Sequence, residues 1–153
     1  MNKPPIIQLT TEGYTAFKKR HAQLQLERKE AVSELKRARE MGDLSENGLY
    51  KASRMKLSSI DHEVRQLNML LKYATIIEPS SSNCISIGSK VVLEQSGIAV
   101  TYTLVGEYEA NPHENRISTK SPLGSKLLGK CMGQSVVIHT PRGKTIYEVK
   151  HIS

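Results

Sequence analysis

The short stretch Gly42–Asn47, with the sequence GDLSEN, carries two carboxylates that could do chemistry. Asp43 and Glu46 lie three positions apart beside a glycine. Mg²⁺ takes oxygen ligands and is often held by one or two carboxylates plus phosphate oxygens, so this pair could help to complete a metal site in another macromolecule. The alternative is structural. In the spacing D-x-x-E, Asp43 would N-cap the following helix and Glu46 would close a capping box.

Basic residues approach the acidic stretch from both sides along the chain. Those before it and after it are Lys36, Arg37, Arg39, Lys51, Arg54 and Lys56. Cations around an isolated acidic turn would guide it towards phosphate backbones. The alternative is an ordinary solvated helical surface with ion pairs. The histidines show no metal-ligand spacing, and no glycine-rich phosphate loop is present.

Two helical series must position the acidic stretch, one before it and one after it. The first series keeps steps of three and four through Tyr14, Phe17, His21, Leu24, Arg28, Ala31, Leu35 and Ala38. The second does so through Tyr50, Ser53, Leu57, Ile60, Val64, Leu67, Leu71 and Ala74. Two such seams joined by a short segment with a glycine predict an antiparallel coiled-coil hairpin. The hairpin is expected over residues 1–77, with its tip at 42–47.

The pattern changes after a segment rich in Pro and Ser. Residues 78–84 have linker composition, which predicts a second domain over 85–153. There the hydrophobic period is two, as in β-strands. Strands are expected at 90–95, 98–106, 116–121, 134–140 and 144–152. One short helix fits after Ser121 as N-cap, with Pro122 in its first turn. The fold class is therefore α+β, with a helical hairpin followed by a small antiparallel β domain carrying one helix.

The totals restrict the classes of protein. The chain has 153 residues, a net charge of +7, 38% hydrophobic residues and 5% aromatic residues. The positive charge indicates a polyanionic partner or an acidic protein surface. No apolar run is long enough for a membrane span, and the first residues do not resemble a signal peptide. Cys84 and Cys131 are far apart in sequence, so neither a disulfide framework nor a zinc site is expected, and a reducing cytoplasm is the expected compartment.

Several motifs resemble one family. The segment REMGDLSENGLYKASR, residues 39–54, is similar to the tip signature of the bacterial Gre transcript-cleavage factors, the GreA/GreB family. Residues 101–130 and the segment TPRGKTIYEV resemble the FKBP-like C-terminal domain of that family. The resemblance covers nearly the whole chain in the family's order and spacing.

The resemblance implies a function and a site. Gre factors bind RNA polymerase at its secondary channel, and their coiled coil reaches the active site. There the tip acids help the polymerase to hold a second Mg²⁺ and to cleave the RNA whose 3′ end has backtracked. By position, the acids correspond to Asp43 and Glu46, donated in trans. Residues expected to face RNA or polymerase are Asn47, Tyr50, Lys36, Arg37, Arg39, Lys51 and Arg54. The factor is expected to be a monomeric accessory protein, not an enzyme, with no cofactor of its own.

Two residues depart from the family pattern, and two further functions stay open. Family members commonly have an acidic residue where this chain has Leu49, and often Ala where it has Gly48. This departure motivates an alternative, a regulator that occupies the channel without stimulating cleavage. The FKBP-like resemblance raises a peptidyl-prolyl isomerase as the other alternative. An isomerase needs an aromatic-lined pocket, and residues 85–153 contain only Tyr102, Tyr108 and Tyr147 as aromatics.

Overall fold

A computed structural model describes residues 6–42, 47–80 and 83–153 of the chain. The chain divides into two units. One unit is Thr15–Tyr73, and the other combines Met1–Tyr14 with Ala74–Ser153. The domain limits inferred from the sequence stay a prediction. Among the helices described, none is both long and apolar enough to cross a membrane.

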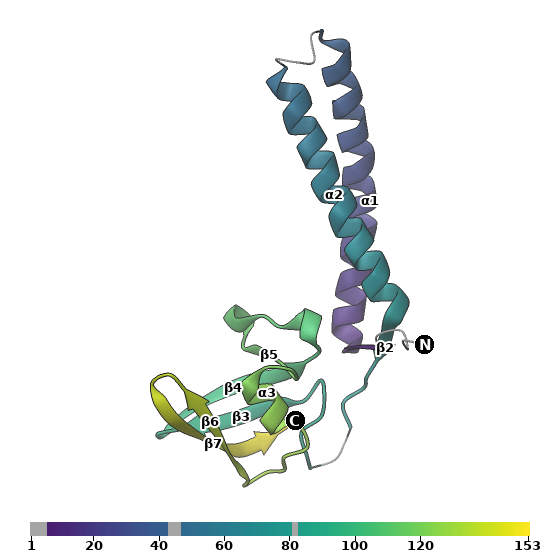
Figure 1. The fold of residues 1–153 in the computed structure, drawn as a ribbon. Helices are drawn as coiled ribbons and strands as arrows, with labels where there is room; N and C mark the ends of the chain where they lie inside the picture. Colours follow the sequence, from purple (N-terminus) through teal and green to yellow (C-terminus); the bar gives the residue numbers. More distant parts are fainter. Residues whose placement is uncertain (1–5, 43–46, 81–82) are drawn as a thin grey trace, which may run out of the picture. The chain divides into compact units, whose positions relative to one another are not determined.

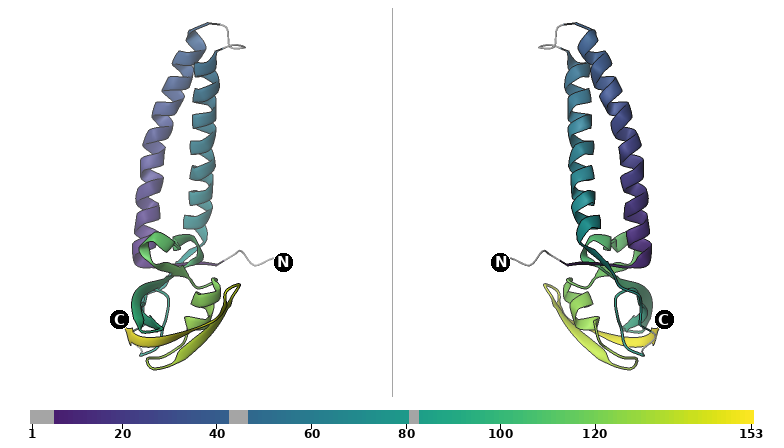
Figure 2. Two further views of the ribbon diagram at one scale, coloured as in Figure 1. Left: turned by 90° about the vertical axis from the view of Figure 1, so that its left-hand side faces the viewer. Right: turned by 90° about the vertical axis from the view of Figure 1, so that its right-hand side faces the viewer.

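Two long helices form the hairpin that the sequence predicts (Figure 1). Helix α1 spans Thr11–Glu40 and helix α2 spans Gly48–Tyr73. Thr10 caps α1, because its Oγ1 accepts a hydrogen bond of 3.0 Å from the backbone N–H of Gly13. The two helices lie side by side in every view, so the end of α1 and the start of α2 lie together at one end of the hairpin (Figure 2).

The hairpin is held by the narrow apolar seam expected from the steps of three and four. Its buried cluster consists of Leu24, Ala31, Ile60, Val64 and Leu67, with Phe17 and Leu57 packed against it. The prediction fails locally near the end of α2. Leu70 is buried there, whereas Leu71 is only half-buried. The seam is thin because small residues such as Ala31 occupy several of its positions.

The two polar positions of the first seam have different environments. Arg28 lies at the exposed edge, where its Nε donates to Asp61 Oδ1 over 2.6 Å. The ring nitrogen Nε2 of His21 is instead buried and has no hydrogen-bond partner among the described residues. A buried polar atom without a partner lowers stability, so the hairpin tolerates a local cost at this position.

The second unit contains a five-stranded sheet in the order β5-β4-β3-β7-β6, whose strands are labelled in Figure 1. Its strands are β3 (Lys90–Gln95), β4 (Ile98–Val105), β5 (Arg116–Ser118), β6 (Ser135–Thr140) and β7 (Gly143–Ile152). The expected α+β fold is confirmed. One pair departs from the antiparallel pattern, since β5 runs parallel to β4. The chain re-enters the sheet in the same direction because two 3₁₀ turns intervene, Glu107–Glu109 and Pro112–Glu114.

Alternating apolar residues of the sheet and one short helix make the core of this unit. Helix α3 spans Pro122–Leu127 and begins as predicted, since Ser121 Oγ accepts from the N–H of Gly124 over 3.0 Å. The buried cluster comprises Ile85, Val91, Leu93, Leu104, Leu127, Val136 and Val149. Strand alternation places these side chains on one face of the sheet, where α3 contributes Leu127.

A second, two-stranded sheet was not anticipated from the sequence. Strand β1 (Ile7–Leu9) pairs in parallel with β2 (Ala74–Ile76), which directly follows α2. Leu9 is fully buried, and its carbonyl accepts a hydrogen bond of 2.8 Å from the N–H of Ile77. Three-residue strands carry too little periodicity to be recognised before the fold is known.

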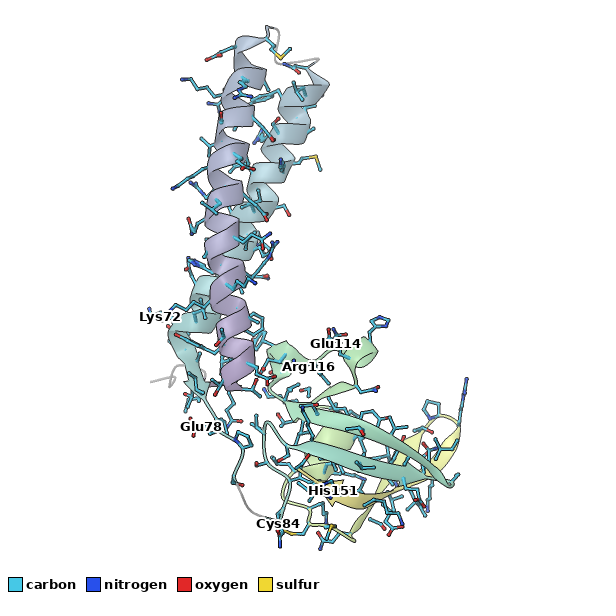
Figure 3. All side chains as sticks on the ribbon, turned by 180° about the vertical axis from the view of Figure 1, so that it is seen from behind. Lys72, Glu78, Cys84, Glu114, Arg116 and His151 are labelled. Carbon is cyan, nitrogen blue, oxygen red and sulfur yellow. A yellow bond between two sulfur atoms is a disulfide. The ribbon has the colours of Figure 1, made fainter. Side chains whose placement is uncertain are left out.

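A buried carboxylate ties the first residues of the chain to the C-terminal part of the same unit. The side chain of Glu109 is 1% exposed and accepts hydrogen bonds from both the N–H and the hydroxyl of Thr10. It also accepts from the N–H of Gly106 and, over 3.2 Å, from Arg116 Nη2. Figure 3 labels Arg116 beside the 3₁₀ turns. A Cβ on Gly13 would lie 1.9 Å from Glu109 Oε1, so only glycine allows this approach.

The expectation that the two cysteines stay unpaired is wrong. Cys84 and Cys131 are joined by a disulfide, and their backbones form an isolated antiparallel bridge. The two cysteines are 47 residues apart in sequence, which gives no sign of the pairing. Strands β3, β4 and β5 and helix α3 lie between them, and only the folded path of these elements brings Cys131 next to Cys84.

Candidate functional site at the hairpin tip

One side chain links the two helix ends at the tip. Asn47 Nδ2 donates to the carbonyl of Ala38 over 2.9 Å, in the last turn of α1. Asn47 Oδ1 accepts from the N–H of Tyr50 over 3.1 Å, in the first turn of α2. Asn47 therefore adds a hydrogen bond to a carbonyl in the last turn of one helix and caps an N–H in the first turn of the other.

This geometry corrects the structural alternative for the acidic pair. Helix α2 begins at Gly48 and its cap is Asn47, so Asp43 does not N-cap this helix. The first turn of α2 contains no acidic residue. Asp43 and Glu46 themselves lie outside the described residues, and their assignment as a metal-binding pair stays a prediction.

The glycine next to the acids ends the first helix. Helix α1 stops at Glu40, and Gly42 has a φ of +114°, which residues with a Cβ rarely adopt. A side chain at this position would meet no neighbour within 4 Å, so the requirement comes from the backbone alone. The end of α1 is therefore explained by the backbone of Gly42. The start of α2 is explained by the cap that Asn47 provides.

A second link between the helices lies beside Asn47. The guanidinium of Arg39 lies over the ring of Tyr50, 5.9 Å from its centroid. This distance is within the range of cation–π attraction. Tyr50 is half-buried and Arg39 is exposed, so the contact joins the last turn of α1 to the first turn of α2 at the surface. The contact of these two residues with RNA or polymerase stays a prediction.

The basic residues of the hairpin fall into two groups. Away from the tip, Arg20 pairs with Glu63 over 2.8 Å, and Lys56 pairs with Glu34 over 2.9 Å. The hydrogen bond from Arg20 to Glu63 raises the pKa of Arg20 above its ordinary value. The predicted phosphate-facing residues near the tip are exposed and make no ion pair with any acid in the described ranges: Lys36, Arg37, Lys51 and Arg54. The alternative of a uniformly ion-paired surface therefore fits the shaft of the hairpin better than its tip.

The tip also exposes apolar side chains. Met41 is 72% exposed and Leu49 is 54% exposed, one on each side of the loop. Gly48 is the first residue of α2, and a Cβ there would meet nothing within 4 Å. Gly48 and Leu49, the two residues that differ from the family pattern, thus lie on the surface and cause no packing defect.

A metal site within this chain alone is not supported by the described residues. Among them, no group of three or more His, Cys, Asp or Glu side chains could hold a metal ion. Asp43 and Glu46 would supply only two carboxylates, and Mg²⁺ prefers octahedral coordination by oxygen. The donor set fits Mg²⁺ only if another molecule supplies the remaining ligands.

The tyrosines of the second unit do not gather in one pocket. Tyr102 and Tyr147 line a hollow of about 170 Å³ beside Leu93 and Val100, whereas Tyr108 lies in a different hollow. Ligand pockets for small molecules usually enclose roughly 300–1,000 Å³. Tyr102 also lines a hollow of about 420 Å³, where it is the one aromatic residue of the lining. The tyrosines of the described part therefore do not come together in a hollow of the size that an isomerase pocket needs.

Comparison with known proteins decides the family. The family model described as "Transcription elongation factor, N-terminal" matches residues 7–76, and "Transcription elongation factor, GreA/GreB, C-term" matches residues 80–153. The chain belongs to the GreA/GreB transcription elongation factor family. The two models meet next to the linker that the sequence indicates, and together they account for both halves of the chain.

Individual relatives agree with the GreA/GreB assignment. The transcription elongation factor GreA of Bacillus cytotoxicus is 38% identical over 146 residues, covering 92% of both chains. GreA of Ruegeria pomeroyi is 37% identical, covering 95% of this chain and 96% of the relative. A solved structure of GreA factor homolog 1 from Thermus thermophilus is 29% identical and covers 97% of this chain and 99% of its own, with a TM-score of 0.48.

We expect Asn47→Ala to lower the free energy of unfolding of this GreA/GreB-family hairpin by about 1 kcal/mol, because an N-cap and a cross-link are both lost. Asn47→Asp should retain the cap, since a carboxylate also accepts from the N–H of Tyr50, and should lose only the bond to Ala38. Thermal unfolding followed by circular dichroism measures the difference. The matched control is Asn68→Ala at an exposed position of α2, which should change stability by less than about 0.5 kcal/mol. Equal effects at both positions would contradict the assigned link.

Proposed function

We propose that this chain binds RNA polymerase at its secondary channel and stimulates cleavage of nascent RNA in backtracked complexes. It would work in the cytoplasm as a monomeric accessory factor, and the polymerase would perform the hydrolysis. Its partners would be the polymerase and the RNA 3′ end, with no membrane involved. Membership of the GreA/GreB family supports this reading across both halves of the chain.

The observation that carries the proposal is that Asn47, the residue after the acidic pair, caps helix α2. Asp43 and Glu46 belong to a loop whose following helix is already capped by Asn47. The stretch that carries them joins two helices that pack on each other through a narrow seam, as a projecting two-helix hairpin does. Two carboxylates beside a helix start that another residue already caps are suited to act on another molecule.

Each part of the tip would have a distinct task. Asp43 and Glu46 would present carboxylate oxygens to the polymerase active site, while Asn47 holds the helix ends together behind them. Exposed cations such as Arg37 and Lys51 would neutralise RNA phosphates nearby. Mg²⁺ held between these oxygens and the polymerase would polarise the phosphodiester and lower the pKa of a bound water.

The test uses backtracked polymerase complexes with labelled RNA in the presence of Mg²⁺. Adding the chain should shorten the RNA from its 3′ end faster than polymerase alone does. Complexes that have not backtracked are the matched control, and their RNA should stay at full length. Shortening no faster than without the chain, in complexes that demonstrably bind it, would refute the proposal.

A second function is favoured by the apolar surface of the tip. Leu49 stands where the family commonly has an acid, and it is 54% exposed beside a first helical residue without a side chain. A tip of this kind could occupy the channel and inhibit transcription without stimulating cleavage. The same assay separates the two functions, because slowed elongation with unshortened RNA supports only the second.

A further inference from the structure

The two cysteines are held together by more than their bond. Beside the Cys84–Cys131 bridge, the N–H of Ile85 donates to the carbonyl of Lys130 over 2.7 Å, and the N–H of Gly129 donates to the carbonyl of Ile85 over 2.8 Å. Ile85 is 2% exposed and belongs to the core of the unit. The backbone and the core therefore keep both cysteines adjacent whether or not the sulfur atoms are bonded.

The pair is also accessible to small molecules. Both cysteines are half-exposed, and the residues next to them, Asn83 and Met132, are exposed. Met132, directly after Cys131, is 61% exposed, so solvent reaches the chain next to the bridge. Figure 3 places Cys84 at the periphery of the unit. Exchange requires a thiolate to reach a disulfide sulfur, and this position provides that access.

The compartment expected for this chain indicates what the disulfide does. This argument rests on the proposed function. A factor that acts on RNA polymerase works where small thiols keep cysteines reduced. Disulfides in such compartments are usually transient and serve catalysis or redox sensing. A purely structural disulfide is unusual in such a compartment. A cysteine pair that is already held in position and is accessible suits reversible oxidation.

We propose that Cys84 and Cys131 form a reversible redox site whose reactants are low-molecular-weight thiols and disulfides. In reduction, a small thiolate attacks one sulfur atom of the bond, forms a mixed disulfide and releases the other cysteine as a thiolate. A second small thiolate attacks the small-molecule sulfur of the mixed disulfide, which forms the small-molecule disulfide and releases the second cysteine as a thiolate. Two small thiols are thereby oxidised, and the cysteines take up two electrons and two protons. Oxidation by a small disulfide follows the same steps in reverse.

The test is a redox titration of the full-length, folded chain in mixtures of reduced and oxidised glutathione. Acid quenching, alkylation and mass spectrometry count the free thiols at each ratio. We expect conversion between zero and two alkylated cysteines, with the same midpoint from both directions and an unchanged far-ultraviolet circular dichroism spectrum. Reduction only after a denaturant is added, or two free thiols at every ratio, would overturn the proposal.

Single variants supply a second readout. In Cys84→Ser and in Cys131→Ser, the remaining cysteine should form one mixed disulfide with glutathione in the folded chain. A remaining cysteine that stays unmodified in a folded variant would argue against access and overturn the site. The wild-type titration stands if a variant does not fold. No polymerase takes part, so failure of the cleavage assay and failure of the redox titration are distinguishable results.

Discussion

Under the proposed function, replacing Asp43 by asparagine should reduce stimulated RNA cleavage at least about 100-fold, because a carboxylate proposed to bind the polymerase Mg²⁺ in the transition state is lost. Glu46→Gln should have an effect of the same order. Both substitutions keep the size of the side chain and remove one negative charge. The measurement is the cleavage rate of backtracked complexes at saturating factor, with binding to polymerase determined separately.

A matched control separates ligation from simple electrostatics at the tip. Glu40→Gln removes the same charge from an exposed residue at the end of α1, and it should change cleavage by less than about twofold. The double variant of Asp43 and Glu46 should be barely worse than either single one, since groups that act as a unit are not additive. Wild-type cleavage by Asp43→Asn would show that the carboxylate pair does not act on the metal.

Replacing Glu109 by alanine should destabilise the unit that contains the five-stranded sheet by about 3–5 kcal/mol. The reason is that the charge of Arg116 and several hydrogen-bond donors lose their partner inside the unit. The groups that lose an acceptor are the N–H and hydroxyl of Thr10, the N–H of Gly106 and the guanidinium of Arg116. Arg116 is already under-satisfied, since its Nε is buried without a partner among the described residues. Urea unfolding measures the global loss, and hydrogen exchange at Thr10 and Gly106 measures the local one.

The neighbouring acid provides the control for this experiment. Glu107 lies two residues earlier and also forms an ion pair, at 2.9 Å with Lys120, but both side chains are at least half exposed. Glu107→Ala should therefore cost less than about 1 kcal/mol, as surface ion pairs do. Similar losses for the two variants would mean that the buried network contributes no more than the exposed pair.

Regular periodicity made much of the fold predictable. The steps of three and four identified the seam of the hairpin, and the alternation of apolar residues identified all five strands of the larger sheet. Ser121 and Pro122 predicted the start of α3, because an N-cap can be recognised from neighbouring residues alone. These features depend on residues close in sequence, where physical preferences act before the fold exists.

Features that depend on distant residues could not be predicted. The stretch around Glu109 has the composition of a polar loop, and only the fold brings Thr10 to it. The pairing of Cys84 with Cys131 depends likewise on how several strands are ordered. At the tip, the D-x-x-E spacing suggested Asp43 as the cap, although Asn47 precedes the helix directly and is an equally good cap by type.

The placement of β1 has a consequence for how the protein is made. Leu9 and Thr10 are synthesised well before Glu109, which hydrogen-bonds Thr10 and lies 99 residues after it. These residues must therefore wait until Glu109 is made before their permanent contacts exist, while the hairpin can already close behind them. A fragment starting after residue 14 would lack this piece, and we expect it to fold correctly only when a peptide of residues 6–14 is added back.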